Sequence, residues 1–519
     1  MRRIALFLAL ILTLGLAAGC GSQQAYVPTG HGLADQDAPI QPTGAAAPTL
    51  PPEDQHFRLA YFPQEGFNPF TCTNINNRML MSLLYQGLFF VDRDYQAVPI
   101  LCKSYVVSPN QRSHTFELER ATFSDGTVLT AEDVVASLKA AEESSLYGGR
   151  FDNIAEIYAA GTHTVRIETY CAYENLPLLL DIPILKATEL EAETPLGTGP
   201  YQLRKVASGM SLQKRSKWWC EAALPVSAES IPLMEAENMA QIRDTFEFDD
   251  LGISISDPGS SSYAEYRCDY ELWEMETGIF LYLGCNLASP VFSNDNVRHA
   301  LTYAINRMAL LDQCYHGFGA VATLPASPSS PFYDRGLAGK VTYQPEMLRQ
   351  ALKDAGMVGQ EIVLLVNKSD SVRLQTARMI KDMLTECGLE VTIQDNSTRY
   401  YKDKLLGDEY DLYLGQTRLS TTMDLTAFFA PYGALSFGDM DDPACYAKAK
   451  EALENSGNYY NLHQLILKDG QLVPLLFRNY AVYAVRGLAQ NLQPSRDNVF
   501  FYSIGKTLED IKSVQEPEE

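Results

Sequence analysis

The sequence predicts an α/β protein, because apolar strand patterns alternate with amphipathic helix patterns from about Gln55 to the end of the chain. The clearest run lies in the last third of the chain, where we expect strands at 362–366, 389–393 and 411–414 and a helix at 377–387. Strands and helices that alternate in this order are typical of βαβ units. The roughly 460 residues after Gln55 are enough for two or three units with hydrophobic cores.

The first twenty residues have the features of an export signal. Arg2 and Arg3 form a short basic region, residues 4–16 are an apolar stretch too short for a stable membrane span, and small residues precede Cys20. The end of this segment is similar to a bacterial lipobox, with Ala17 where Leu is commonest. We therefore expect a lipoprotein signal peptide at 1–19 and lipidation of Cys20. The alternative is ordinary signal-peptide cleavage that leaves Cys20 as a spare thiol.

Residues 20–54 are expected to form a flexible tether. Gly, Gln, Pro, Thr and Ala are in excess there, and no periodic apolar pattern would let the segment bury enough surface to fold. No later segment has the roughly 18 unbroken apolar residues of a membrane span. We expect a soluble globule that the lipid on Cys20 holds at the outer face of the bacterial cytoplasmic membrane, whether or not the cell has an outer membrane.

The charge and the cysteines narrow the choice of partners. A net charge of -23 argues against a nucleic-acid partner and fits either acidic solubility or attraction of cationic ligands. Of ten cysteines, nine remain when Cys20 is set aside, so at least one is outside any intramolecular disulfide. None are spaced as CxxC, and we expect most to be small buried residues rather than zinc or redox ligands.

No local signature of catalysis is present. The seven histidines are isolated from one another, and HExxH, GxSxG, GxxxxGK[ST] and GxGxxG are absent. The glycines of 197–200 lack the third Gly of a phosphate loop and predict a sharp turn into a strand at 201–203. These absences favour a binding protein over an enzyme, although a triad of residues distant in sequence would escape a motif search.

Residues 123–138, FSDGTVLTAEDVVASL, predict a strand, a tight turn and a capped helix. Asp125 and Gly126 form the turn, and Thr130 is placed as the helix N-cap with Asp133 three residues later. The carboxylates of Asp125, Glu132 and Asp133 invite an acid–base interpretation. Carboxylates at a helix start are favoured by the helix dipole, however, so we interpret the stretch as scaffold.

Several segments, in order along the chain, resemble the family 5 extracellular solute-binding proteins of the peptide/nickel type, which deliver solutes to ABC importers. Residues 123–138 fall on the most specific motif of that family, and the resemblance covers about 55–504. The other matching segments are Asn68–Phe70 (NPF), Leu84–Phe89 (LYQGLF, with Gln86 for Glu), Pro99–Ser104 (with Cys102 for Ala), Gly197–Leu203 (containing TGPY), Val297–Arg307 (VRHALTYAINR) and Tyr343–Gly356 (with Leu348 for Ala).

The resemblance implies a two-lobed, periplasmic-binding-protein-like α/β fold of type II topology with an extra small β-rich domain. Two crossover strands would form the hinge, and a solute would close the lobes around itself. The implied domains are lobe I at 55–91, 199–278 and 484–512, the small β-rich domain at 92–198, and lobe II at 279–483.

The expected ligand site lies where strand ends and loops meet the cleft of such a fold. In the family, one crossover strand ends near Asn286 and lines the cleft, where Tyr282 fits either ligand contact or core packing. The residues expected to bind the ligand are Asn68, Tyr85, Phe280, Tyr282, Asn286, Gln416, Thr417, Arg418 and Leu419.

One segment departs from the family pattern. Peptide-binding members usually carry GWxxD where this chain has 415–419, GQTRL, and the Asp pairs with the α-amino group of the peptide. Leu419 cannot pair with an ammonium group. Arg418 could instead bind a carboxylate or phosphate through its two-pronged guanidinium, or it could face solvent or form an ion pair. Asp424 and Leu425 are expected to shape the following loop.

The predicted function is an extracytoplasmic receptor that captures a solute, most plausibly an oligopeptide, and delivers it to an ABC permease and ATPase. We expect a monomer that needs no cofactor or metal and catalyses no reaction. The alternatives are a sensory or surface protein with the same fold, a receptor for a metal chelate or oligosaccharide, and an exported hydrolase. The absence of a histidine cluster disfavours nickel or haem, but a metal bound through an organic chelator would leave no such mark.

Overall fold

The computed structural model describes residues 58–499, apart from 208, 223–227, 249, 487–491, 493 and 497. The signal peptide at 1–19, Cys20, the tether at 20–54 and the end of the segment 484–512 lie outside the described residues. Within the described part, every helix is too short or too polar to cross a bilayer.

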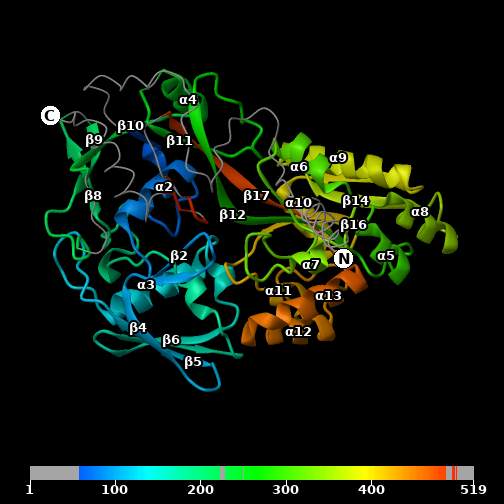
Figure 1. Ribbon diagram of the computed structural model, residues 1–519, viewed down its shortest axis with the longest axis horizontal. Helices are drawn as coiled ribbons and strands as arrows, with labels where there is room; N and C mark the ends of the chain where they lie inside the picture. Colours follow the sequence, from blue (N-terminus) through cyan, green and yellow to red (C-terminus); the bar gives the residue numbers. More distant parts are fainter. Residues whose placement is uncertain are drawn as a thin grey trace, which may run out of the picture.

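Two long antiparallel strands, β12 (Tyr270–Cys285) and β17 (Leu472–Val485), run from one half of the molecule to the other (Figure 1). They pair with each other along nearly their whole length, with irregularities of register at Glu276/Ile279 and Leu281/Tyr282. In the first half β17 also pairs with β11 (Ile253–Ser256), and in the second half β12 also pairs with β16 (Leu412–Arg418). One sheet of eleven strands therefore continues through both halves.

The first half is built on the strand order β11-β1-β10-β9-β8 of this sheet, with α2 and α4 packed on it. Gly197 and Gly199 precede β8 and lie against the end of α2. A Cβ atom on Gly197 would be 2.2 Å from the carbonyl oxygen of Leu84, so this contact requires glycine. The remaining elements here are β1 (Leu59–Tyr61), η1 (Pro63–Glu65), α2 (Ile75–Leu84), β8 (Tyr201–Val206), β9 (Gly209–Lys214), β10 (Ser230–Glu235) and α4 (Met239–Glu247).

A separate sheet of four antiparallel strands, in the order β4-β5-β7-β6, lies between β1 and β8 in the sequence and is covered by α3. This sheet lies within 92–198, and the exact domain boundaries stay a prediction. Its elements and their neighbours are β2 (Phe89–Val91), β3 (Ala97–Pro99), β4 (Cys102–Val107), β5 (Ser113–Leu118), α3 (Ala131–Glu143), η2 (Gly148–Arg150), β6 (Ile154–Gly161), β7 (Thr164–Thr169), η3 (Leu176–Leu179) and η4 (Ala187–Glu189).

The turn and capped helix expected at 123–138 are confirmed, but in place of the expected strand there is only an isolated bridge between Thr122 and Val128. Gly126 has a φ of 87°, and α3 begins after Thr130. The Asp133 carboxylate accepts hydrogen bonds from the Thr130 amide (2.9 Å) and hydroxyl (2.7 Å), while Asp125 forms an ion pair with Lys186 at 2.5 Å. Two of the three carboxylates that invited an acid–base interpretation thus hold the local structure.

In the second half, helices cover both faces of the sheet. Successive side chains of β14 (Glu361–Asn367) alternate between two cores, with Leu364 in the core formed with α5, α6, α8 and α9, and Leu365 in the core formed with α10 to α13. The other elements are α5 (Asp295–Leu301), α6 (Arg307–Tyr315), β13 (Gly319–Val321), α7 (Arg335–Ala338), α8 (Pro345–Asp354), α9 (Ser371–Glu386), β15 (Glu390–Asn396), α10 (Thr398–Leu406), α11 (Thr426–Phe429), α12 (Pro443–Glu454), η5 (Ser456–Asn458) and α13 (Tyr459–Asp469).

The structure has the strands and the helix that were expected between 362 and 414, but these elements begin or end at other residues than expected. Helix α9 starts at Ser371 because the Asp370 side chain accepts a hydrogen bond from the Arg373 amide and caps it. Strand β16 continues to Arg418 because it pairs with β12 as far as Ile279, a partner that is distant in sequence.

The cysteines follow the expectation of small buried residues. All nine from Cys72 to Cys445 are free thiols, and six of them are buried. The buried ones are Cys72, Cys102, Cys285, Cys314, Cys387 and Cys445.

Candidate functional site

Two adjoining hollows lie beside α2 in the first half of the molecule, and the second of them also reaches the crossover strands and Arg418 of the second half. The first has a volume of about 90 Å³ and lies between α2, β2 and the segments near 150, 181 and 496. The second has a volume of about 60 Å³ and lies between α2, β11, the middle of β12 and β17, and Arg418 at the end of β16. Arg78 on α2 lines both hollows. The second hollow is lined from both halves, and a concave site of this kind fits a solute that is held between them.

Of the nine residues predicted to bind the ligand, Tyr85 and Arg418 line these hollows. Tyr85 forms part of the wall of the first hollow, and its hydroxyl group donates hydrogen bonds to the carbonyl oxygens of Phe67 (2.9 Å) and Pro195 (3.2 Å). Arg418 lies in the second hollow, where β16 pairs with β12 at Ile279.

The two predicted asparagines instead hold loops in place. Asn68 donates hydrogen bonds to the carbonyl oxygens of Leu190 (2.7 Å) and Ala192 (3.0 Å). Asn286 donates to the carbonyl oxygens of Tyr410 (2.8 Å) and Asp408 (3.2 Å), in lobe II beyond the end of β12. Both side chains are buried, so their polar groups are satisfied within the protein.

The other five predicted residues also have partners within the second half. The rings of Phe280 and Tyr282 are buried and stack on each other with centroids 5.3 Å apart. Gln416 accepts a hydrogen bond from Arg478 at 3.0 Å, Thr417 pairs with Phe280 in the strand ladder, and Leu419 is buried. A ligand-binding role for all nine residues stays a prediction, and these seven do not line the two hollows.

Most side chains that line the hollows were not predicted from the sequence to bind the ligand, and four of them are arginines or a tyrosine that contacts arginines. Arg78, Tyr147, Arg150 and Arg496 line the first hollow, and Arg78 also lines the second. A signal for Arg78 was present in the sequence, because it is the one charged residue of the ten-residue helix INNRMLMSLL. Arg150 ends the three-residue helix η2 and Arg496 lies after β17, so neither belongs to an element long enough for a periodic pattern to indicate a direction.

The four-stranded sheet domain and the second half touch each other beside the hollows. The Tyr173 hydroxyl lies 2.9 Å from that of Thr422, and Asn153 donates to the Asp424 carboxylate at 2.9 Å. Burial raises the pKa of Asp424, and burial together with the charge of Asp424 raises the pKa of Asp152. Asp424 also accepts the Thr426 amide at 2.8 Å, as a residue that shapes the loop would.

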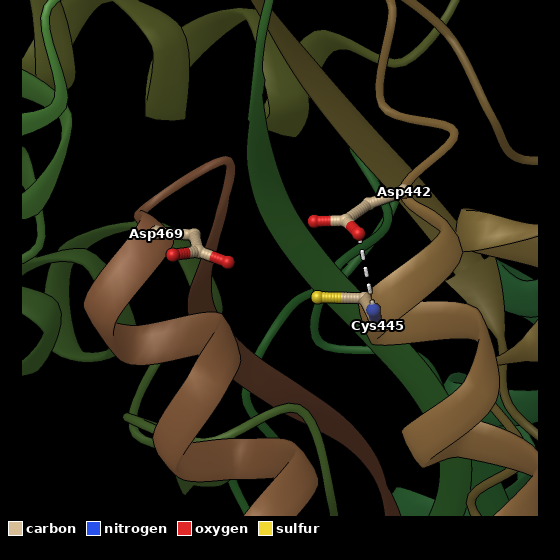
Figure 2. Close-up of side chains that lie close together, drawn as sticks. All are labelled: Asp442, Cys445 and Asp469. Atoms are coloured by element: carbon tan, nitrogen blue, oxygen red, sulfur yellow. Dashed lines mark hydrogen bonds between the residues drawn. The ribbon is translucent and has the colours of Figure 1, made fainter.

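Asp442, Cys445 and Asp469 offer ligand atoms that lie within 4.8 Å of one another, at the start of α12 and the end of α13 (Figure 2). Asp442 is the N-cap of α12 and accepts hydrogen bonds from the amides of Ala444 (2.7 Å) and Cys445 (3.2 Å). Burial and the two nearby carboxylates raise the pKa of the Cys445 thiol. Because a metal ligand must be the thiolate, this arrangement favours a protonated, structural cysteine.

Glu274 is a buried carboxyl group on β12, one of the two crossover strands, and its pKa is shifted. Burial raises its pKa to about 7, although Asn479 donates a hydrogen bond to it at 2.8 Å. The folded state therefore holds a proton that the unfolded state releases near the ordinary pKa of 4.5, and stability falls as the pH rises from 4.5 to 7.

We expect the Glu274→Gln variant to be more stable than the unchanged chain above pH 7, by up to about 3 kcal/mol, since each pKa unit corresponds to about 1.4 kcal/mol. The difference should disappear below pH 4.5, where both folded and unfolded states hold the proton. Urea unfolding at several pH values measures it, with the exposed Glu361→Gln as the control. A difference that does not depend on pH would contradict the prediction.

Two α/β lobes joined by paired crossover strands, with a hollow lined from both lobes, define the architecture of a solute-binding protein. The chain belongs to the bacterial extracellular solute-binding proteins, family 5, whose middle-region model matches residues 96–439.

Relatives and solved structures agree with this family. The chain is 27% identical over 354 residues to the glutathione-binding protein GsiB of Shigella flexneri, covering 64% of this chain and 68% of that protein. The oligopeptide-binding protein AppA of Bacillus subtilis, solved with a nonapeptide, has a TM-score of 0.60 and 19% identity over 88% of this chain and 98% of AppA. NikA of Brucella suis, solved with Fe(III)-EDTA, has a TM-score of 0.65 and 16% identity over 83% and 96%.

The predicted family, the two-lobed α/β fold and the role of solute-binding receptor in a bacterial ABC import system are therefore confirmed. The protein is extracytoplasmic, and its relatives are binding proteins of transporters.

Proposed function

We propose that this receptor captures an oligopeptide or a related oligomeric solute in the two hollows and passes it to an ABC permease and ATPase. It acts as a monomer, catalyses no reaction and is anchored to the outer face of the cytoplasmic membrane by a lipid on Cys20. The names of relatives support a peptide ligand, because GsiB binds glutathione and AppA was solved with a nonapeptide.

The observation that carries the proposal is the second hollow. Its wall combines α2 and β11 of the first half with Met275 and Tyr480 of the crossover strands and Arg418 of the second half. A solute here would touch both lobes and the hinge at once. Binding would therefore favour the closed arrangement by the difference in its affinity for the closed and open forms.

Residues 415–419 (GQTRL) differ from the GWxxD of peptide-binding family members, and this difference sets which end of the peptide points toward β16. Leu419 is buried and apolar where peptide-binding relatives usually carry an Asp, so the α-amino group finds no carboxylate at this position. Arg418 lies in the second hollow, where its guanidinium could bind the carboxyl terminus of the peptide. In this arrangement the carboxylate end of the solute, rather than its amino end, points toward β16.

Native mass spectrometry of the full chain with a mixed tri- to octapeptide pool tests the proposal. Retained masses that match peptides are the expected result. Ser82 lines the first hollow, so Ser82→Trp should abolish retention by filling it, whereas Ser262→Trp on an exposed loop should not. If a known relative retains peptides and this chain retains none, the ligand belongs to another class, such as the chelates seen in NikA.

The anchor is tested separately in bacterial cells grown with an alkyne-tagged fatty acid. We expect the label on the chain and its recovery in the membrane fraction. Both should be lost in Cys20→Ala and kept in Cys72→Ala, which changes a buried cysteine of the folded part. A labelled Cys20→Ala chain would contradict lipidation at this residue.

A further inference from the structure

The charged side chains that line the two hollows are mostly arginines. Arg78, Arg150 and Arg496 line the first hollow, and Arg78 and Arg418 line the second. Asp181 is the one acidic side chain among the described residues of either wall. The whole chain has 41 basic and 64 acidic residues, so the hollows reverse the overall charge balance.

Local contacts place two of these arginines against one aromatic ring. The guanidinium of Arg78 lies 5.8 Å and that of Arg150 5.1 Å from the centre of the Tyr147 ring. Arg78 also donates a hydrogen bond to the Tyr147 hydroxyl at 3.4 Å, and Arg150 forms an ion pair with Asp181. Tyr147 therefore sets the separation of two cationic groups in the wall of the first hollow.

The other two arginines come together from opposite halves of the molecule. Arg496 lies after β17 and donates hydrogen bonds to the carbonyl oxygens of Leu419 and, at 3.0 Å, Ser420. These are the residues that directly follow Arg418. The Arg496 guanidinium therefore lies next to the backbone that follows Arg418, and a ligand in the adjoining hollows meets guanidinium groups at more than one point.

Like charges gathered in a confined space repel one another, and an anion that enters between them is attracted strongly because little water screens it. Guanidinium groups also bind carboxylates through two parallel hydrogen bonds, which fixes the position of each acidic group. The same arginines would repel a cationic solute.

We infer that these hollows select an anionic solute with at least two carboxylates, such as an acidic peptide, over neutral and cationic solutes of the same size. The inference rests on the proposed function, in which the hollows are the solute site. It names the ligand by charge, and peptides and non-peptide carboxylates remain to be told apart by experiment.

Isothermal titration of the full chain compares five probes: Glu-Ala-Glu, Ala-Ala-Ala, Lys-Ala-Lys amide, glutathione and tricarballylate. We expect Glu-Ala-Glu to bind at least tenfold more tightly than Ala-Ala-Ala, and Lys-Ala-Lys amide not to bind. Arg418→Gln should weaken Glu-Ala-Glu by roughly ten- to a hundredfold, the effect of losing a charged hydrogen-bond partner. It should weaken Ala-Ala-Ala by a smaller factor, because that peptide has one carboxylate.

Two further variants show whether a loss of affinity comes from the missing Arg418 guanidinium or from a defect in folding. Arg418→Lys keeps the charge without the forked geometry and should restore part of the affinity. Arg243→Gln changes an arginine on α4 that pairs with Asp244 outside both hollows and should leave every affinity unchanged. Matching thermal unfolding curves of the three variants show that each is folded.

The measured affinities separate the selection of anions from the binding of peptides. Equal affinity for the three tripeptides would leave a peptide receptor in place and overturn the selection of anions. Binding of tricarballylate but of no peptide would support anion selection and overturn the peptide ligand. If no probe binds, the inference and the peptide proposal both fail.

Discussion

Arg478→Met is expected to lower the free energy of unfolding by about 3–5 kcal/mol, the usual cost of removing one partner from a buried ion pair. Arg478 lies on β17, and its side chain is 6% exposed. It donates hydrogen bonds to both carboxylate oxygens of Asp257, at 2.8 and 3.0 Å, and to Gln416 at 3.0 Å. Asp257 follows β11 in the first half and Gln416 belongs to β16 in the second, so one side chain connects both lobes at the crossover.

The chemistry of this site explains the size of the expected effect. Burial is the largest single effect and lowers the pKa of Arg478, but the charge and hydrogen bonds of Asp257, together with Tyr315 and Tyr480, outweigh it, and the pKa is raised. The guanidinium also lies 5.4 Å from the centre of the Tyr315 ring. Methionine fills much of the same volume, so the variant isolates the loss of charge and hydrogen bonds from the loss of packing.

Urea unfolding followed by tryptophan fluorescence measures the effect. Arg243→Met is the matched control, because Arg243 and Asp244 form a more exposed pair at 3.7 Å, and it should change stability by less than about 0.5 kcal/mol. Arg478→Met and Asp257→Asn should combine to less than the sum of their separate effects. Additive effects, or a loss below 1 kcal/mol for Arg478→Met, would show that the pair does not stabilise the crossover.

Tyr173→Ala is the second change with a large expected effect, about 3–5 kcal/mol, the range for removing a large buried ring. Tyr173 is 1% exposed and lies where the four-stranded sheet domain meets the second half. Its hydroxyl group hydrogen-bonds with that of Thr422 at 2.9 Å. Removing the ring leaves a cavity on one side of this contact and takes away a link between the two parts.

Tyr173→Phe keeps the ring and should cost about 1 kcal/mol, the net contribution of one hydrogen bond. Tyr170, three residues earlier, is 66% exposed, so Tyr170→Ala should change stability by less than about 0.5 kcal/mol. Unfolding in guanidinium chloride, followed by circular dichroism, compares the three variants. If Tyr173→Ala and Tyr170→Ala cost the same, the closed contact between the domains contributes nothing to stability.

Local sequence patterns were enough to predict several elements. The alternation of apolar residues predicted strands β14, β15 and β16, and Thr130 with Asp133 predicted the start of α3. Helix and strand periodicity depends on which face of the local backbone is buried, so it can be seen in a window of a few residues. The end of β16 was missed because its pairing with β12 joins segments that are far apart in the sequence.

In the candidate site, too, local sequence indicated some residues that line the hollows and others that do not. Arg418 was expected from its place in a motif, but Asn68 and Asn286 occur in similar motifs and donate to backbone carbonyls that hold loops. An asparagine that supports a loop and one that binds a ligand have the same local sequence signal. Which of the two roles it has depends on whether a backbone carbonyl or open space lies opposite its amide.

The sequence by itself determined the class of the protein: an exported α/β chain with an expected lipid anchor, no catalytic motif and the motifs of family 5. These features are local, because each depends on residues that are neighbours in the sequence. Only the tertiary structure decided where the hollows lie and that Arg78, Arg150, Arg418 and Arg496 line them. These arginines come from four separate segments that meet only through long-range contacts: Arg78 and Arg150 through the Tyr147 ring, Arg496 through its hydrogen bonds to 419–420, and Arg418 through the pairing of β16 with β12.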